Sequence, residues 1–361
     1  MTEQDFIPSG YEATATSGSF TWRAPSNIAL VKYWGKRGEQ LPANPSVSFT
    51  LDACATTTTL RYKKREYPDD DFGFELYLDG AVKDSFKPKI NDFFHRIGKY
   101  MPFLKHYHFT IETSNSFPHS SGIASSASGM SALALCLMSL EQEISGNITE
   151  EDFFRKASFI ARLGSGSACR SIRGELVVWG SHPEIAGSTD LYGVAYPGKV
   201  HPVFRTYQDT ILLVDRGEKQ VSSTAGHGLM HGHPFAERRF AQASENLSAL
   251  QQVLETGDTE AFIAIVEREA LTLHAMMMTG KPYFILMSPA TLDVIRKIWS
   301  FRKETGVPVC FTLDAGANVH VLYPESEKEA VMEFINNELV AYYEKGHYIC
   351  DRIGGGAVAL P

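Results

Sequence analysis

Short runs in which apolar and polar residues alternate fill the first half of the chain, and this pattern predicts β-strands. The predicted strands cover residues 20–23, 47–51, 56–62, 74–78, 108–113 and 174–179. Asp79-Gly80 directly follows one of these runs and favours a hairpin turn. Ala24–Asn27, between the first run and the apolar stretch after it, is expected to turn the chain.

Longer segments predict helices, most of them in the second half. The helical segments are 91–101, 130–140, 149–162, 234–255, 258–278, 289–305 and 326–343. Strands return at 210–214, at 309–313 and 319–322, where a hairpin is expected, and at 357–360. Because strands and helices come in blocks and not as a regular β–α–β alternation, the pattern favours an α+β fold in both halves.

Irregular sequence rich in Gly and Pro fills residues 180–208 and indicates a boundary between two domains. The chain of 361 residues is long for a single core and comfortable for two. We therefore expect a flexible N-terminal arm over 1–19, an N-terminal domain over 20–205 and a C-terminal domain over 206–361.

Composition and charge narrow the class of protein. The chain has 43% hydrophobic and 21% charged residues, as ordinary globular proteins do, and a net charge of −8. A nucleic-acid binder would need a broad basic face, so the acidic balance argues against that class.

The lack of a recognisable targeting signal and the pattern of cysteines predict a cytoplasmic protein. No apolar run approaches the roughly 20 residues that span a bilayer, and residues 1–19 lack the apolar core of a signal peptide. The five cysteines are scattered without a Cys-x-x-Cys pair, which indicates neither a disulfide framework nor a zinc site. A reducing, cytoplasmic setting fits best, without a membrane partner.

Asn115–Gly129 is crowded with small residues and hydroxyls, and a strongly helical apolar run follows at once. A helix N-terminus presents backbone N–H groups without intrahelical partners and a partial positive charge. Gly122 would let a phosphate come close, and Ser125, Ser126 and Ser128 would add hydroxyl donors. The stretch therefore predicts a phosphate site, and a Ser-rich cap on a core helix is the alternative. The Gly-Lys-Ser/Thr ending of the Walker pattern is missing.

Two further stretches place cations beside small residues. In Lys32-Tyr-Trp-Gly-Lys36, a bend at the glycine would let both ammonium groups face one pocket, and a solvated basic turn is the alternative. In Gly164-Ser-Gly-Ser-Ala-Cys-Arg170-Ser, the serines and turn N–H groups would form a second anion site. Arg170 would offer a bidentate fork to a carboxylate or phosphate. A flexible Gly/Ser linker is the competing interpretation there.

Asp314 follows an apolar strand and precedes Ala-Gly-Ala-Asn318. A carboxylate at such a turn often closes an Asx turn. If Asp314 instead faces a cleft with Lys32 and Arg170, it could orient or deprotonate a substrate hydroxyl.

Three histidines, His227, His231 and His233, lie close together in a Gly-rich loop. Their spacing fits neither a helical zinc-protease site nor a structural zinc pattern, so a polar surface loop is the preferred interpretation.

Together these stretches resemble the diphosphomevalonate decarboxylases, a family of the small-molecule (GHMP) kinase superfamily. The matching segments follow the family's order from about residue 20 onward: Ala24-Pro-Ser-Asn-Ile-Ala-Leu-Val-Lys-Tyr-Trp-Gly-Lys-Arg37, Phe117-Pro-His-Ser-Ser-Gly-Ile-Ala-Ser-Ser-Ala127, Gly164-Ser-Gly-Ser-Ala-Cys-Arg-Ser171, Val221-Ser-Ser-Thr224 and Leu313-Asp-Ala-Gly-Ala-Asn318. The phosphate loop is typical of the superfamily, whereas the segments around Lys32 and Arg170 are more specific to the decarboxylases.

The resemblance implies a fold and a reaction. The N-terminal domain would be ribosomal-protein-S5-domain-2-like and the C-terminal domain ferredoxin-like, with the active site in the cleft between them. The implied reaction is the ATP- and Mg²⁺-dependent decarboxylation of (R)-5-diphosphomevalonate to isopentenyl diphosphate, through phosphorylation of the C3 hydroxyl. A homodimer is the family expectation.

The resemblance also assigns roles to residues. Lys32, Arg170 and Asp314 would be catalytic. The substrate-binding positions would be Tyr33, Lys36, Ser165, Gly166, Ser167, Arg170 and Ser223. The ATP phosphates would be held by Ser120, Gly122, Ala124, Ser125, Ser126 and Ser128, and Ser126 is also the candidate Mg²⁺ contact.

The sequence departs from the family at several positions. Asn44-Pro-Ser46 replaces Asn-Ser-Ser, His119-Ser-Ser replaces Thr-Ala-Ala, His227 stands where Met is more common, and Ala317 replaces a proline. Residues 61–89 offer no clear match for a basic residue that the family often places there.

These departures leave rival functions open. The nearest rival has the same chemistry on 5-phosphomevalonate. A kinase of the superfamily that does not decarboxylate is disfavoured because Lys32, Arg170 and Asp314 are retained. A non-catalytic nucleotide-binding regulator is disfavoured because neither Asp314 nor the phosphate loop is lost.

Overall fold

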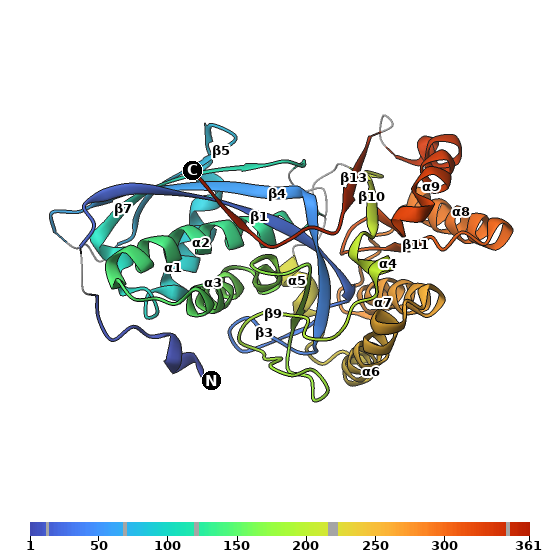
Figure 1. The fold of residues 1–361 in the computed structure, drawn as a ribbon, viewed down its shortest axis with the longest axis horizontal. Coiled ribbons are helices and arrows are strands. Elements are labelled where there is room, and N and C mark those ends of the chain that lie inside the picture. The colour runs from blue at the N-terminus through green and yellow to red at the C-terminus, as the bar shows by residue number, and fades with distance from the viewer. Residues whose placement is uncertain (12–13, 68–70, 119–122, 216–222, 344–346) are drawn as a thin grey trace.

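The computed structural model describes residues 1–11, 14–67, 71–118, 123–215, 223–343 and 347–361, with residues 223–225 described by their backbone only. Two β-sheets, one built mainly from each half of the chain, organise the fold, and helices pack against both (Figure 1). The α+β class predicted from the sequence is confirmed.

The larger sheet has the strand order β14-β1-β4-β7-β5-β6, with β8 and β9 added beside β4. Its strands are β1 (Ser17–Val31), β4 (Ser46–Lys64), β5 (Gly73–Leu78), β6 (Ala81–Val82), β7 (Tyr107–Asn115), β8 (Leu176–Trp179), β9 (Val194–Ala195) and β14 (Val358–Leu360). One edge of the long strand β4 pairs with β1, and the other pairs first with β8 and then with β7. A separate ribbon joins β2 (Lys36–Arg37) to β3 (Leu41–Pro42).

Three helices lie together beneath this sheet in Figure 1: α1 (Lys87–Ile97), α2 (Ser125–Ser145) and α3 (Glu150–Gly164). α1 lies between β5 and β7 in the chain, and a crossover of this kind allows the two strands to run parallel. Most residues of α2 are buried, because it packs against the sheet strands and against α3. α3 begins after Thr149, whose hydroxyl accepts the Asp152 N–H as the capping pattern predicts.

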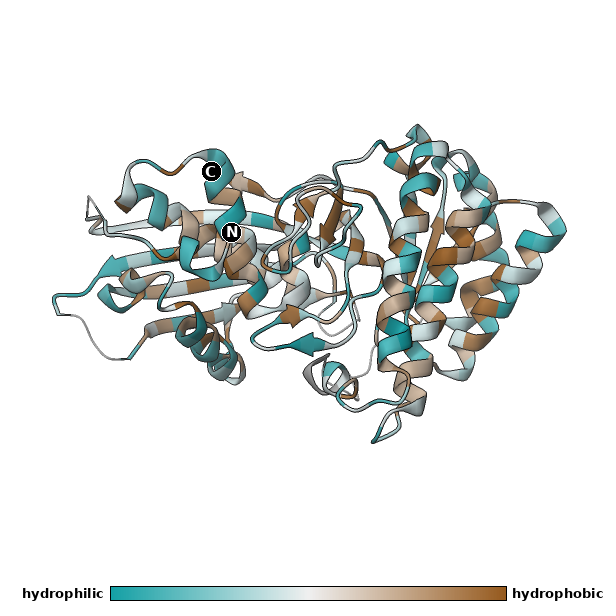
Figure 2. Ribbon diagram, turned by 90° about the horizontal axis from the view of Figure 1, so that it is seen from below, coloured by the Kyte–Doolittle hydropathy of each residue, from teal (hydrophilic) through white to brown (hydrophobic). Residues whose placement is uncertain are grey.

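The smaller sheet is antiparallel, in the order β11-β12-β10-β13. The elements of this half are α4 (Pro202–Arg205), β10 (Gln208–Leu212), α5 (Ser223–Gly228), α6 (Ala236–Thr256), α7 (Thr259–Thr279), α8 (Pro289–Thr305), β11 (Cys310–Thr312), β12 (Val319–Tyr323), α9 (Lys328–Phe334) and β13 (Tyr348–Arg352). Asp258 and Ser288 cap α7 and α8 through their side-chain oxygens. Figure 2 shows many of the hydrophobic residues of these helices facing the interior of this half. No helix in the described part of the chain combines the length and apolarity that crossing a bilayer requires.

Both ends of the chain lie in the first half of the molecule. β14 pairs with β1, so that Thr21 lies opposite Leu360. Most described residues of the stretch 1–19, where we predicted a flexible arm, are exposed, but Phe6 and Ala15 are buried. A 3₁₀ turn at Glu3–Phe6 places the 6%-exposed Phe6 on the ring of Phe159, with centroids 4.0 Å apart, and burial of this aromatic side chain holds the segment in place.

Three local predictions are wrong. β1 continues through Ala24–Asn27, where a register shift against β4 accommodates Pro25 without a turn. The helix expected over 91–101 begins earlier, at Lys87, and ends at Ile97. The helix expected over 326–343 is broken, because α9 ends at Phe334 and a wider π turn followed by a tighter 3₁₀ turn continues to Tyr342.

Candidate active site

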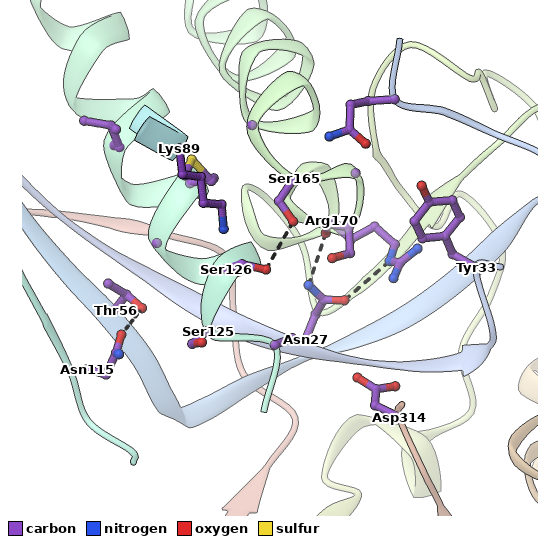
Figure 3. A pocket seen from close by; sticks show the side chains of 18 of the residues that line it. Asn27, Tyr33, Thr56, Lys89, Asn115, Ser125, Ser126, Ser165, Arg170 and Asp314 are labelled. Carbon is purple, nitrogen blue, oxygen red and sulfur yellow. Dashed lines mark hydrogen bonds between the residues drawn. The ribbon is translucent and has the colours of Figure 1, made fainter. Parts of the chain in front are cut away.

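A cavity of about 530 Å³ lies between the two halves of the chain. Its walls come from β1, β4, β5, β7, α1, α2 and the turn Gly166–Ser171 on one side, and from α5, α7 and the turn after β11 on the other. Figure 3 shows Ser126 facing Ser165, and Asp314 pointing into the cavity from the wall opposite Arg170.

Lys32 and Asp314 form an ion pair at one end of the cavity. The Nζ–Oδ1 distance is 2.9 Å, with 2% of the lysine side chain and 29% of the aspartate side chain exposed. Lys32 directly follows β1 and Asp314 lies just beyond β11, so strand ends from the two halves meet here. Such a pair can orient a hydroxyl through the carboxylate and stabilise negative charge through the ammonium.

The backbone of Lys32 is held by a buried charged network. Its N–H donates to Glu269 Oε2 over 2.8 Å, and its carbonyl oxygen accepts from Arg239 Nη2 at 3.0 Å and Asn44 Nδ2 at 2.9 Å. Glu269 and Arg239 pair at 2.6 Å with neither side chain exposed. Because a buried ion pair tolerates little displacement, this network fixes the position of the Lys32 backbone, from which the side chain extends to Asp314.

His274 holds the backbone of Asp314 in a similar way. Its Nε2 lies 3.1 Å from the Asp314 carbonyl oxygen. Burial lowers the pKa of His274 to about 4, so the ring is neutral and donates its Nε2 proton to that carbonyl. α7 therefore positions both members of the ion pair, one through Glu269 and the other through His274.

Arg170 is a buried cation, 3% exposed, in the cavity wall. Its Nη1 donates to Ser46 Oγ over 2.5 Å and its Nε donates to Asn27 Oδ1 over 3.4 Å. Burial lowers its pKa. Across the described residues no carboxylate lies within ion-pair distance of Arg170. A buried guanidinium without a counter-ion is suited to receive a carboxylate or phosphate.

The N-terminal end of α2 opens onto the cavity. Ala124, just before the helix, adopts the left-handed conformation with φ of 42°, and Ser125 and Ser126 form the first turn. Ser126 Oγ lies 3.3 Å from Ser165 Oγ, and both residues line the cavity together with Gly166 and Ser167. The free N–H groups of this turn and its hydroxyls form a donor-rich surface.

Ser128 does not belong to this surface, so its predicted role as a phosphate ligand is corrected. It is fully buried, and its hydroxyl lies 2.6 Å from Thr56 Oγ1. The helical period carries this position toward β4, whereas Ser125, Ser126 and Gly129 line the cavity. Ser120 and Gly122 lie outside the described residues, as does the side chain of Ser223.

Tyr33 and Lys36 lie at the same end of the cavity as Arg170. The Tyr33 hydroxyl is buried and has no partner in the described chain, and a Cβ on Gly166 would approach it to 2.9 Å. Burial, together with the charges of Arg96 and Lys89, lowers the pKa of Lys36 to about 8. The end is therefore rich in hydrogen-bond donors.

The opposite end of the cavity is apolar. Its lining side chains are Leu76, Leu78, Phe86, Ile90, Ile111, Met130 and Leu133. Thr56, Lys89 and Asn115 supply polar groups at its edge, and Thr56 Oγ1 donates to Asn115 Oδ1 over 2.6 Å. Such walls fit a flat apolar group better than a second anion.

The structure collects in one cavity the predicted residues Lys32, Tyr33, Lys36, Ala124, Ser125, Ser126, Ser165, Gly166, Ser167, Arg170 and Asp314. Our reasoning from sequence missed Asn27, Glu269 and His274, which hold these residues in place. The prediction of a polar surface histidine loop is wrong for His227 and His233, which are each 7% exposed.

No group of three or more His, Cys, Asp or Glu side chains within the described ranges could hold a metal ion. A Mg²⁺ ion that arrives with a nucleotide needs few protein ligands, because phosphate oxygens and water complete its shell. The Ser126 hydroxyl at the helix end suits that arrangement.

The fold, with its active cleft between two domains, is that of the small-molecule (GHMP) kinase superfamily. Residues 24–190 match the diphosphomevalonate decarboxylase-like N-terminal domain, and residues 210–352 match the mevalonate 5-diphosphate decarboxylase C-terminal domain. The diphosphomevalonate decarboxylase of Aspergillus fumigatus is 31% identical over 338 residues, which cover 89% of this chain and 79% of that protein. The chain belongs to the diphosphomevalonate decarboxylase family.

Solved structures of the family are similar over nearly the whole chain. The mevalonate diphosphate decarboxylase from Enterococcus faecalis has a TM-score of 0.80 and 27% identity, covering 96% of this chain and 99% of that one. A structure described as MDDEF in complex with MVAPP, AMPPCP and magnesium has the same TM-score, 28% identity and the same coverage. The enzyme from Staphylococcus aureus also has a TM-score of 0.80, with 26% identity and coverage of 96% and 99%.

Proposed function

We propose that this protein catalyses the ATP-dependent decarboxylation of (R)-5-diphosphomevalonate to isopentenyl diphosphate, with CO₂, ADP and phosphate as the other products. Arg170 carries the proposal, because it is a buried guanidinium without a carboxylate partner among the described residues, in the same cavity as the Lys32–Asp314 pair. A kinase needs the pair and a phosphate site, but only a decarboxylase must also hold the substrate carboxylate in line with the reacting carbon. The arginine therefore favours a substrate that reacts next to its carboxylate.

The first step is phosphoryl transfer to the C3 hydroxyl. Asp314 accepts the hydrogen bond of that hydroxyl and aligns its oxygen for in-line attack on the γ-phosphoryl group of ATP. As the new O–P bond forms and the bond to ADP breaks, Asp314 takes the hydroxyl proton. Lys32, 2.9 Å from the carboxylate, stabilises the negative charge around the reacting oxygens.

The second step is elimination. Phosphorylation turns the C3 oxygen into a leaving group, and the C3–O bond breaks as phosphate leaves. The electrons of the C1–C2 bond then form the C2–C3 double bond, and C1 departs as CO₂. Arg170 binds the carboxylate through its fork, so that the C1–C2 bond is aligned with the carbon that loses the phosphate.

ATP fits the other part of the cavity. Its phosphates would lie at the N-terminal end of α2 beside Ser125 and Ser126, and its base against the apolar wall that includes Leu76 and Ile111. Mg²⁺ bound with the nucleotide would lie beside the Ser126 hydroxyl and would neutralise charge on the phosphates.

The test is turnover of purified protein with ATP, Mg²⁺ and 5-diphosphomevalonate, with CO₂ and ADP followed together. We expect equal amounts of both, and a higher kcat/KM than with 5-phosphomevalonate. ADP without CO₂ would instead identify a kinase, and a preference for 5-phosphomevalonate would identify the monophosphate enzyme. No turnover of any mevalonate derivative would refute the proposal.

We expect a homodimer in the cytoplasm. The chemistry of the five cysteines, all free and four of them buried, suits a reducing compartment. Sedimentation of the purified protein tests the dimer, and fractionation of the source cells tests the compartment.

A further inference from the structure

His227 is a buried histidine in the cavity wall that the proposed mechanism leaves without a role. It lies in α5 with 7% of its surface exposed. Its ring packs between those of Tyr33 and Trp34, with centroid distances of 4.2 and 4.8 Å. The mechanism gives no reason for a histidine here, so its polar atoms need an explanation of their own.

The hydrogen bond of the ring defines its tautomer. Nδ1 lies 3.1 Å from the Gly35 nitrogen and accepts its N–H, so the proton of the neutral ring is on Nε2. Burial and the nearby charges of Lys36 and Arg170 hold the pKa of His227 well below its usual value, which keeps the ring neutral. None of the described residues accepts a hydrogen bond from Nε2.

Neighbouring donors share this lack of an acceptor. The buried Tyr33 hydroxyl has no partner among the residues that the structure describes, and no described carboxylate lies within ion-pair distance of Lys36. The backbone N–H of Gly35 donates to His227, and Gly35 directly precedes Lys36 in the chain. The hydrogen bond therefore links the position of Lys36 to that of His227. Donors that lie on one wall of a cavity fit a ligand that offers several acceptors, as a phosphate chain does.

We propose that His227 strengthens the preference of this protein for a diphosphate over a monophosphate, by donating its Nε2 proton to a terminal phosphate oxygen while Nδ1 fixes Gly35 beside Lys36. The proposal rests on the proposed function, because it assigns one residue to the phosphate end of that substrate. A monophosphate lacks the oxygen that Nε2 would bind, so its complex has one charged hydrogen bond fewer than the diphosphate complex.

Three substitutions separate the two nitrogens of the ring. His227→Phe keeps the aromatic packing and removes both polar atoms. His227→Asn places an amide oxygen near the position of Nδ1 and removes the Nε2 donor, whereas His227→Gln places an amide nitrogen near Nε2. His231→Phe, at an exposed position in the turn that follows α5, is the matched control.

The main readout is kcat/KM for 5-diphosphomevalonate divided by kcat/KM for 5-phosphomevalonate. We expect the ratio to fall about 10-fold or more in the Phe and Asn variants, through a higher KM for the diphosphate, because each loses one hydrogen bond to a charged group. The Gln variant should keep most of the ratio, and neither KM for ATP nor the control should change. If the histidine only filled space, its replacement would change kcat/KM for both substrates by the same factor. An unchanged ratio in the Phe and Asn variants therefore overturns the proposal.

A binding experiment tests His227 without turnover. Inorganic pyrophosphate and orthophosphate are titrated calorimetrically into protein whose nucleotide site is filled with a non-hydrolysable ATP analogue and Mg²⁺. The wild type should bind pyrophosphate more tightly, and the Phe and Asn variants should lose about 10-fold for pyrophosphate only. If no mevalonate derivative is turned over, the proposed function fails while this titration still decides on His227. Equal pyrophosphate affinities of wild type and His227→Phe overturn the inference in either case.

Discussion

The two parts of the cavity that would meet at the transferred phosphoryl group are built in opposite ways. At the Lys32–Asp314 pair, buried side chains of α7 hold the backbone of each residue. At the N-terminal end of α2, the contacts are hydroxyls at longer range, such as the 3.3 Å between Ser126 and Ser165. One region is fixed by charge pairs, and the other is a surface of small donors.

This difference matches what each region has to do. A group that accepts a proton must keep its distance to the reacting oxygen within a few tenths of an ångström, because misplacement by ~1 Å can cost about 100-fold in rate. A phosphate chain is held by many weak donors, and the loss of one is shared among the rest. Substitutions at the ion pair should therefore act on kcat, and those at the helix end on KM for ATP.

The largest effect is expected for Asp314→Asn. The amide keeps the shape but cannot take the hydroxyl proton, so kcat should fall by about 10³ or more. CO₂ and ADP release at saturating substrates measure it. Asp190→Asn is the control, because that carboxylate pairs with the exposed Arg37 at 3.0 Å. A near-normal kcat would remove Asp314 from the mechanism.

Glu269→Gln tests the support beneath Lys32. It leaves the fully buried Arg239 without a counter-ion, which should cost about 3–5 kcal/mol of unfolding free energy. The double variant Arg239→Met/Glu269→Leu removes both charges and should recover most of that stability in a urea titration. Its kcat should stay at least ~10-fold low, because the Lys32 N–H still lacks its acceptor. Full recovery of kcat would show that the network serves stability alone.

Ser126→Ala should raise KM for ATP by about 10-fold and change kcat little, because one of several phosphate donors is lost. Ser128→Ala is the matched variant, two positions along the same helix. It breaks a contact with Thr56 in the core and should cost about 1 kcal/mol of stability, with KM for ATP unchanged. Equal KM values in the two variants would contradict the division of α2 into a cavity face and a core face.

The smallest effect concerns pH. Lys36 is charged below its pKa of about 8 and neutral above it, so binding of a phosphorylated substrate is strongest below that pH. kcat/KM for the phosphorylated substrate should therefore fall roughly 3- to 10-fold between pH 7 and 9, since this ratio reports groups of the free enzyme. Lys36→Arg, which stays charged, should flatten this limb of the profile. If wild type and Lys36→Arg lost kcat/KM equally between pH 7 and 9, the titrating group would be one other than Lys36.

Residue types and local pattern indicated candidate anion-binding groups, and the resemblance to a known family assigned them roles. Lys32, Arg170 and Asp314 come from three segments far apart in the chain, and the expectation that they face one cleft is met. Pattern was also enough for most strands and for the ranges of α7 and α8, which were expected at 258–278 and 289–305.

Supporting contacts could not be predicted. In the sequence, Glu269 and His274 look like ordinary polar residues of a helix that has both polar and apolar residues. Their role depends on which strand ends pack against α7, and the sequence alone does not show this packing. Ser128 was misassigned because the helix was expected to start at residue 130, whereas α2 starts at Ser125. The expected start left the serines before it outside the helix, so the pattern could not show which of them point to the core. Phe6 was missed because an isolated aromatic residue in a polar stretch shows no periodicity.

The return of the chain through β14 has a mechanical consequence. The polypeptide crosses between the two halves twice, once before β10 and again after β13, where Leu51 bridges to Ile353. Two rigid halves joined by two connections can rotate freely only about the line through those connections. The connections oppose sliding and twisting of one half against the other. Any opening of the cleft to admit ATP should therefore follow a single axis, and cutting the chain just after β13 would release the restraint.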